Sequence, residues 1–253
     1  MKIVVCIKQV PDLEDVSWSA DNTINTGVEV VLNPFDEFAI EAALKIKDST
    51  EDVQVIALSV GDLESKSILE RAIAMGCDDA ILISDEKLKK ADSQMIAKVL
   101  SRAILSKIPD FALVFCGQFS IDGMSGNVGP SLAQYLGVPQ VSYGKEMILL
   151  PQNKILVTKQ TEYGLEKLKM QLPALVCTIK GVKPRKFTVG GVIKAQNSTI
   201  DVYNLDDIFM DNFDEEDSSF TTIYKTFLPK NARKCQFLEE SSMILSILEG
   251  KNV

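Results

Sequence analysis

Four short apolar runs, each followed by an amphipathic segment, are the feature that most constrains the fold of this chain. The runs cover residues 3–7, 53–60, 80–84 and 111–116. They are rich in Val and Ile and apolar at consecutive positions, which is typical of parallel strands covered on both faces. This β-α-β-α order predicts a doubly wound, mostly parallel α/β sheet, whose ligands lie beyond the carboxyl ends of the strands.

The second half of the chain follows a different pattern. Residues 154–162 and 165–172 flank Tyr163-Gly164 and predict an antiparallel hairpin. We expect one α/β domain over residues 1–205. Residues 206–253 carry few core positions and an acidic stretch, so we expect an extended C-terminal arm that packs on another subunit.

The sequence from Asp122 to Gly129 follows the fourth apolar run and precedes an amphipathic segment at 130–135. A small-residue loop between a strand and a helix exposes backbone N–H groups at the positive end of the helix dipole. This arrangement predicts a site for the phosphate or pyrophosphate of a nucleotide. The glycines also fit a tight turn with no ligand. The loop matches neither GxGxxG nor GxxxxGK[ST], which disfavours a standard nicotinamide Rossmann domain and a P-loop ATPase.

Composition excludes several function classes. The chain has no histidine, which removes Ser-His-Asp catalysis and imidazole zinc sites, so we expect no metal and no catalytic side chain. Any chemistry then belongs to a cofactor. A net charge of −8 argues against binding to nucleic acid. No apolar run reaches the length of a membrane span, and five scattered cysteines indicate reduced thiols in a cytoplasm.

Individual residues near the strand ends fit ordinary structural roles as well as a binding site. Lys8 after the first strand is either a solvated charge or a group that faces a phosphate or flavin. Asn33 or Asp36 can cap the helix that Pro34 begins. Cys6 fits a small core residue.

Several segments in family order resemble the beta subunit of electron transfer flavoproteins. They are residues 4–12 (VVCIKQVPD), 33–43 (NPFDEFAIEAA), 72–78 (AIAMGCD), the Asp122 loop, and then 164–166, 172–174, 184–185 and 193–195. The resemblance spans roughly residues 1–205. It implies an adenine-nucleotide-binding fold and a heterodimer with an alpha subunit that carries FAD.

The resemblance also implies a nucleotide pocket in this subunit. Ordinary carriers of the family hold AMP there, and the electron-bifurcating branch holds a second FAD. The cofactor-binding positions expected in this chain are Cys6, Lys8, Asn33, Val60, Asp122, Gly123, Ser125, Gly126, Asn127, Val128 and Gly129.

The loop pattern favours the bifurcating branch. Ordinary carriers tend to have three acidic residues and then Asn-Gln-Thr-Gly, whereas Asp122-Gly123 and the later Val128-Gly129-Pro130 are similar to the bifurcating pattern. Gly123 allows closer backbone approach and adds no charge, which suits a pyrophosphate. We therefore expect FAD here, with AMP as the alternative. The implied donor is NADH, and the acceptors are ferredoxin or flavodoxin and a flavin-dependent dehydrogenase, such as an acyl-CoA or hydroxy-acid dehydrogenase.

Two positions depart from the family pattern. Gln118 stands where a basic residue is common, and Val189, beside Gly190-Gly191, stands at the leucine that docks the redox partner. The smaller Val189 implies a different partner or weaker docking. Two alternatives stay open: an ordinary carrier with structural AMP, and a stand-alone regulatory domain of the universal-stress-protein type that needs no alpha subunit.

Overall fold

The computed structural model of this chain describes residues 1–12, 29–181, 183–209, 219–224 and 244. The chain divides into two compact units, 1–16 with 26–223 and 17–25 with 224–253. The second unit contributes only Tyr224 and Ile244 to the described residues, both exposed.

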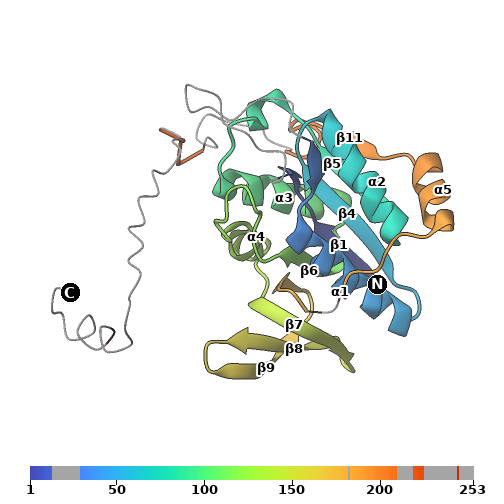
Figure 1. Cartoon of the computed structure of the whole chain (residues 1–253), viewed down its shortest axis with the longest axis vertical. Coiled ribbons are helices and arrows are strands. Elements are labelled where there is room, and N and C mark those ends of the chain that lie inside the picture. The colour runs from blue at the N-terminus through green and yellow to red at the C-terminus, as the bar shows by residue number, and fades with distance from the viewer. Residues whose placement is uncertain (13–28, 182, 210–218, 225–243, 245–253) are drawn as a thin grey trace. The chain divides into compact units, whose positions relative to one another are not determined.

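A nine-stranded sheet forms the centre of the first unit (Figure 1). Its strands in spatial order are β11 (Asp201–Tyr203), β5 (Asp79–Ile83), β4 (Gln54–Val60), β1 (Lys2–Cys6), β6 (Phe111–Gly117), β10 (Ala174–Thr178), β7 (Gln140–Leu150), β8 (Lys154–Thr161) and β9 (Gly164–Gln171). The strands from β11 to β7 pair in parallel, and β7, β8 and β9 pair antiparallel. The predicted doubly wound, mostly parallel sheet is confirmed.

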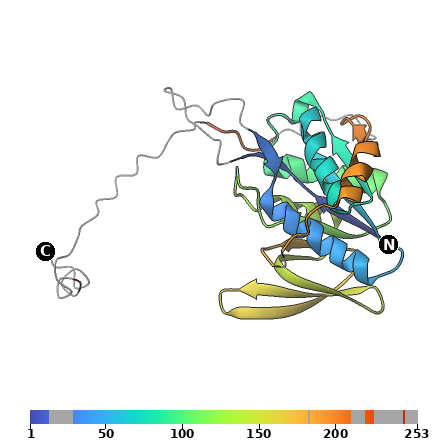
Figure 2. The same cartoon turned by 45° about the vertical axis from the view of Figure 1, so that its right-hand side comes forward.

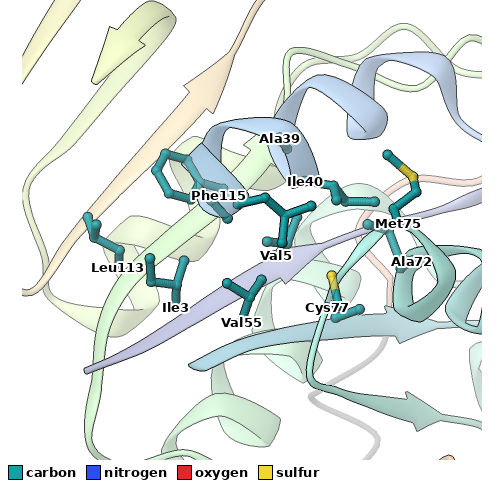
Figure 3. Packing of buried hydrophobic residues seen from close by; sticks show 14 of the residues in the cluster. Ile3, Val5, Ala39, Ile40, Val55, Ala72, Met75, Cys77, Leu113 and Phe115 are labelled. Carbon is teal, nitrogen blue, oxygen red and sulfur yellow. The ribbon is translucent and has the colours of Figure 1, made fainter. Parts of the chain in front are cut away.

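Helices cover both faces of the parallel strands. On one face, Ile3 and Val5 pack with α1 (Pro34–Ser49) and α2 (Lys66–Met75). Figure 3 shows Phe115 and Val5 of the sheet under Ala39 and Ile40 of α1. On the other face, alternate strand residues pack with α3 (Ser93–Lys107) and α4 (Val128–Leu136). A further helix, α5 (Val189–Asn197), lies against α2 (Figure 1).

The order of the strands creates a switch point between β1 and β6. After β1 the chain builds β4 and β5 on one side, and it then returns to place β6 on the other side of β1. The connections therefore leave the neighbouring carboxyl ends of β1 and β6 in opposite directions. In sheets of this kind that divergence opens a crevice where ligands bind. A short antiparallel ribbon of β2 (Gln9–Pro11) and β3 (Val30–Leu32) lies in the connection between β1 and α1.

The antiparallel strands extend the sheet beyond β10, as Figure 2 shows from a second direction. The predicted hairpin is confirmed as β8 and β9. Gly164 begins β9 with φ +139°, a backbone conformation that favours glycine. The sequence analysis did not predict β7, which pairs with β10 in parallel and continues antiparallel to β8.

The chain stays attached to the sheet after the predicted domain boundary. β11 adds an edge strand to β5, and Leu205 and Ile208 are buried in the core beside α3. Further on, Asp92 at the start of α3 accepts hydrogen bonds from the backbone N–H and the hydroxyl of Thr221. Most of the predicted arm over 206–253 lies outside the described residues, so the arm stays a prediction. Within the described ranges no helix is long and apolar enough to cross a bilayer.

Candidate nucleotide site

The carboxyl ends of β4, β1 and β6 bring most of the predicted cofactor positions to one edge of the sheet. Cys6 at the end of β1 is in register with Leu58 of β4 and with Cys116 of β6. Val60 ends β4, and the loop at 118–127 leaves β6 at the same edge. The structure therefore places Cys6, Lys8, Val60 and the loop around the switch point, although they are far apart in the sequence.

Three thiols form a row across this edge. Cys6, Cys116 and Cys177 are in register on β1, β6 and β10, and all three are buried free cysteines. The hydrogen bond with Cys6, together with burial, raises the pKa of Cys116 well above its usual range, and burial raises the pKa of Cys177. Cys116 and Cys177 are therefore protonated near neutral pH and cannot act as thiolate nucleophiles. The described residues include no cluster of His, Cys, Asp and Glu that could hold a metal ion.

Helix α4 starts directly above this row. A Cβ atom on Gly129 would overlap Sγ of Cys177, so glycine is needed for the helix to lie this close to the sheet. The first N–H groups of a helix have no intrahelical acceptor. Within the described residues, no protein acceptor is recorded for the N–H groups of Val128 and Gly129, and Pro130 has no N–H. Two donors are therefore available at the positive end of the α4 dipole.

Asn33 fastens the first half of the loop. Its Nδ2 donates to the carbonyl of Phe119 over 3.0 Å, and its Oδ1 accepts from the N–H of Ile121 over 3.3 Å. The Phe119 ring also contacts the Phe35 ring, with 4.3 Å between the centroids. Asn33 occupies the N-cap position of α1 but makes no side-chain cap hydrogen bond. The capping interpretation is therefore wrong for this side chain, which positions the loop, and its predicted contact with a cofactor stays a prediction.

The second half of the loop is open. Gly123 is exposed, and a Cβ atom there would meet only Oγ of Ser120, at 3.9 Å. Gly126 has φ +64°, which favours glycine, whereas Met124 adopts φ +49° despite its side chain. The hydroxyl of Ser125 accepts a long hydrogen bond of 3.4 Å from the N–H of Asn127. A ligand can therefore approach the backbone here without displacing side chains.

Lys8 and Asp122 form an ion pair between the end of β1 and the loop that follows β6. The Lys8 Nζ lies 2.6 Å from Oδ2 of Asp122, and half of the Lys8 side chain is exposed. Partial burial raises the pKa of Asp122, but hydrogen bonds from Lys8 and Ser120 outweigh it and leave that pKa below its ordinary value. The pair joins the end of β1 to the loop that precedes α4, and its two opposite charges offset each other.

Sequence analysis missed Asp36 as a site residue and gave it only a capping role. Its carboxylate is buried and accepts hydrogen bonds from the N–H of Lys8 over 2.7 Å, the N–H of Gly117 and the amide of Asn33. Burial raises the pKa of Asp36 to about 7, against the lowering effect of these donors. The run Asn33-Pro34-Phe35-Asp36 could have indicated this role. It places a carboxylate in the first turn of α1, and that turn lies next to the end of β1.

The donor groups of this edge fit the phosphate of a nucleotide. Backbone N–H groups at a helix start and a lysine ammonium are a usual set of phosphate donors. Next to Val60, the hydroxyl of Ser59 is fully buried and has no hydrogen-bond partner within the described part of the chain. Lys8, Val128 and Gly129 would hold a phosphate or pyrophosphate, and the carboxylate of Asp122 can accept from ribose hydroxyls.

The predicted docking residue lies far from this site in the sequence, at the start of α5. The Val189 side chain is 79% exposed. Gly191 lies so close to α2 that a Cβ atom would overlap the carbonyl oxygen of Ala74. This glycine is therefore needed for helix packing, and the pair of glycines is not by itself a sign of a weak anchor.

The fold and the site define a doubly wound α/β protein with a phosphate-type anion site at its switch point. A family model described as the electron transfer flavoprotein domain matches residues 22–207. The electron transfer flavoprotein subunit beta of Megasphaera elsdenii is 38% identical over 208 residues, which are 79% of this chain and 77% of that protein.

Two further relatives carry names of reductase complexes. The caffeyl-CoA reductase-Etf complex subunit CarD of Acetobacterium woodii is 37% identical and covers 82% of this chain and 80% of its own. The acryloyl-CoA reductase electron transfer subunit gamma of Anaerotignum propionicum is 35% identical over 90% of this chain and 89% of its own. The chain belongs to the electron transfer flavoprotein family, as a beta subunit, and its role is electron transfer.

Proposed function

We propose that this chain binds FAD at the switch point and takes part in flavin-based electron bifurcation. In this proposal, one of the two electrons from NADH goes to ferredoxin or flavodoxin. The other passes through the FAD of an alpha subunit to a flavin-dependent dehydrogenase, such as an acyl-CoA or hydroxy-acid dehydrogenase. The observation that carries the proposal is the open backbone at Gly123, in the loop that leads to the two N–H groups of α4 with no acceptor among the described residues.

Room along the loop supports FAD over AMP, whereas the low charge at the rim suits either anion. The ion pair of Lys8 and Asp122 leaves little net negative charge beside the anion site. A pyrophosphate that carries a riboflavin needs both room along the loop and low repulsion, and Gly123 supplies the room. The ordinary carrier, with structural AMP in this subunit, is the second candidate, since the same donors also fit a single phosphate.

The flavin, when bound, would supply hydride acceptance and one-electron transfer. The chain would supply binding and orientation. Lys8, Val128 and Gly129 would hold the phosphates, while Cys6, Val60 and the buried row of thiols would line the side of the pocket. Because Cys116 and Cys177 are protonated, neither places a thiolate beside the anionic ligand.

Partner chains complete the proposed assembly. Electron transfer flavoprotein beta subunits pair with an alpha subunit, and we place the arm over 206–253 on that subunit. The names of the two reductase-complex relatives support a CoA-ester reductase or dehydrogenase as the redox partner. The exposed Val189 is the proposed docking residue, and the compartment is the cytoplasm.

Anaerobic rapid mixing of NADH with the purified heterodimer tests this proposal. Direct hydride transfer to a flavin predicts fast bleaching of flavin absorbance at one equivalent of NADH. NADPH at the same concentration is the matched comparison for donor specificity. Flavin absorbance that stays constant with NADH, but falls when a reduced dehydrogenase is added, would reject bifurcation and support the ordinary carrier.

A further inference from the structure

The Asp36 carboxylate lies at the point where the two central strands separate. Its Oδ2 accepts a hydrogen bond of 2.7 Å from the backbone N–H of Lys8, which follows β1. The carboxylate also accepts a hydrogen bond from the N–H of Gly117, the last residue of β6. A Cβ atom on Gly117 would overlap Oδ1 of Asp36, so the glycine makes room for the carboxylate. At a switch point the strand ends turn away from each other, and this side chain joins them.

The same carboxylate is connected to the loop through Asn33. The Asn33 amide donates to Asp36 and also to the carbonyl of Phe119, while its Oδ1 accepts from Ile121. Each polar atom of the Asn33 amide therefore has a protein partner. The amide therefore ties the first half of the loop, at Phe119 and Ile121, to the start of α1, which carries Asp36.

We propose that Asp36 is a positioning residue of the nucleotide site. Its carboxylate holds the ends of β1 and β6 together and, through Asn33, fixes the position of the loop that receives the phosphate. This inference rests on the proposed nucleotide binding at the switch point. Asp36 is buried and does not reach the ligand itself; it acts by fixing the Lys8 backbone and the loop.

Protonation of Asp36 would disturb this arrangement. A neutral carboxyl turns one acceptor oxygen into a donor, and here that oxygen faces N–H groups. The charged and titratable groups that interact with it are Lys8 from the end of β1 and Cys116 from β6, and Lys8 in turn pairs with Asp122 of the loop. Asp122 has a lowered pKa and Cys116 a raised one, so neither changes charge near neutral pH. Burial raises the pKa of Asp36 to about 7, which places its proton uptake just below that pH.

Titration of FAD into the nucleotide-depleted heterodimer at pH 8 and pH 6 tests the proposal. FAD is the probe because its pyrophosphate lacks the ionisation near pH 6 of a terminal phosphate. We expect wild-type affinity to fall several-fold from pH 8 to pH 6. Asp36→Asn should weaken binding about tenfold at pH 8, since a charge-assisted acceptor is lost, and should show no further loss at pH 6.

Glu41→Gln is the matched control. Glu41 lies in the same helix, is buried like Asp36, and holds the Arg185 side chain and backbone N–H instead of the strand ends. This variant should lower thermal stability yet keep wild-type FAD affinity and its pH dependence. Amide hydrogen exchange of the peptide over 117–122 gives a readout that needs no ligand, and it should be faster in Asp36→Asn alone.

The outcomes separate the two levels of the argument. Wild-type binding that is equal at both pH values, together with unchanged affinity and exchange in Asp36→Asn, would overturn the role of Asp36 and leave the nucleotide site intact. If Asp36→Asn does not fold, the wild-type protein still tests the proposal, because equal FAD affinity at pH 6 and pH 8 would reject the positioning role of Asp36. Failure of wild-type protein to bind FAD, ADP or AMP at either pH would overturn both the proposed function and this inference.

Discussion

Substitution of Gly129 by Ala tests how closely α4 must lie on the sheet for the anion site to exist. A Cβ atom at this position would overlap Sγ of Cys177 and would lie 3.6 Å from Cβ of Cys116. The sheet residues beneath are fully packed, so α4 has to move outward or the thiol has to find another rotamer. Overpacking of this kind costs about 1–3 kcal/mol, which exceeds the gain of up to about 1 kcal/mol from replacing glycine inside a helix.

Thermal unfolding of the heterodimer measures this cost. For a domain of this size, about 1–3 kcal/mol lowers Tm by several degrees. Gly123→Ala is the control, because its Cβ atom meets only Ser120 Oγ at 3.9 Å, and it should change Tm little. Cys177→Ala removes the clashing sulfur, so the double substitution should recover most of the loss. Equal stability of the two alanine variants, or purely additive losses in the double variant, would refute the packing argument.

Three further predictions concern charge, pH and docking. Lys8→Met should weaken FAD binding about tenfold at low salt, since a charge-assisted hydrogen bond to phosphate is lost, and isothermal titration checks this; unchanged affinity and salt dependence would remove Lys8 from the site. Burial raises the pKa of Asp36 from 3.8 to about 7, so the folded state keeps a proton that the unfolded state releases. Stability should therefore fall as pH rises between these values, by roughly 2–3 kcal/mol from pH 5 to pH 8. Asp36→Asn should lack this part of the slope in a Tm series against pH; identical slopes would contradict it. Val189→Asp should weaken docking to the partner dehydrogenase in a pull-down titration without changing flavin content, because the side chain is 79% exposed; parallel loss of flavin would indicate a folding defect instead.

Much of the fold could be predicted because its signals are local. Runs that are apolar at consecutive positions, such as residues 111–116, indicate parallel strands buried on both faces, and Tyr163-Gly164 indicates a hairpin. Strands with weaker patterns were missed. β7 pairs with β10 in its first part and with β8 in the rest, and most of its residues are not buried. β11 is a three-residue edge strand whose pairing with β5 joins residues far apart in the sequence.

The site was predictable in its location but not in its connections. A glycine-rich loop after a buried strand indicated the anion site, and the topology places it at the switch point. The pairing of Lys8 with Asp122 and the grip of Asn33 on the loop join residues more than 80 positions apart. No local pattern encodes such contacts. Asp36 was interpreted as a helix cap because short-range spacing shows the helix that carries it, whereas its donors come from two strands.

Release and counting of the nucleotides in the purified heterodimer tests the central claim most directly. Acid precipitation followed by chromatographic separation gives FAD and AMP per heterodimer. Electron bifurcation with a flavin at the switch point predicts two FAD and no AMP. One FAD and one AMP would contradict it and would make this chain the AMP-binding subunit of an ordinary electron carrier.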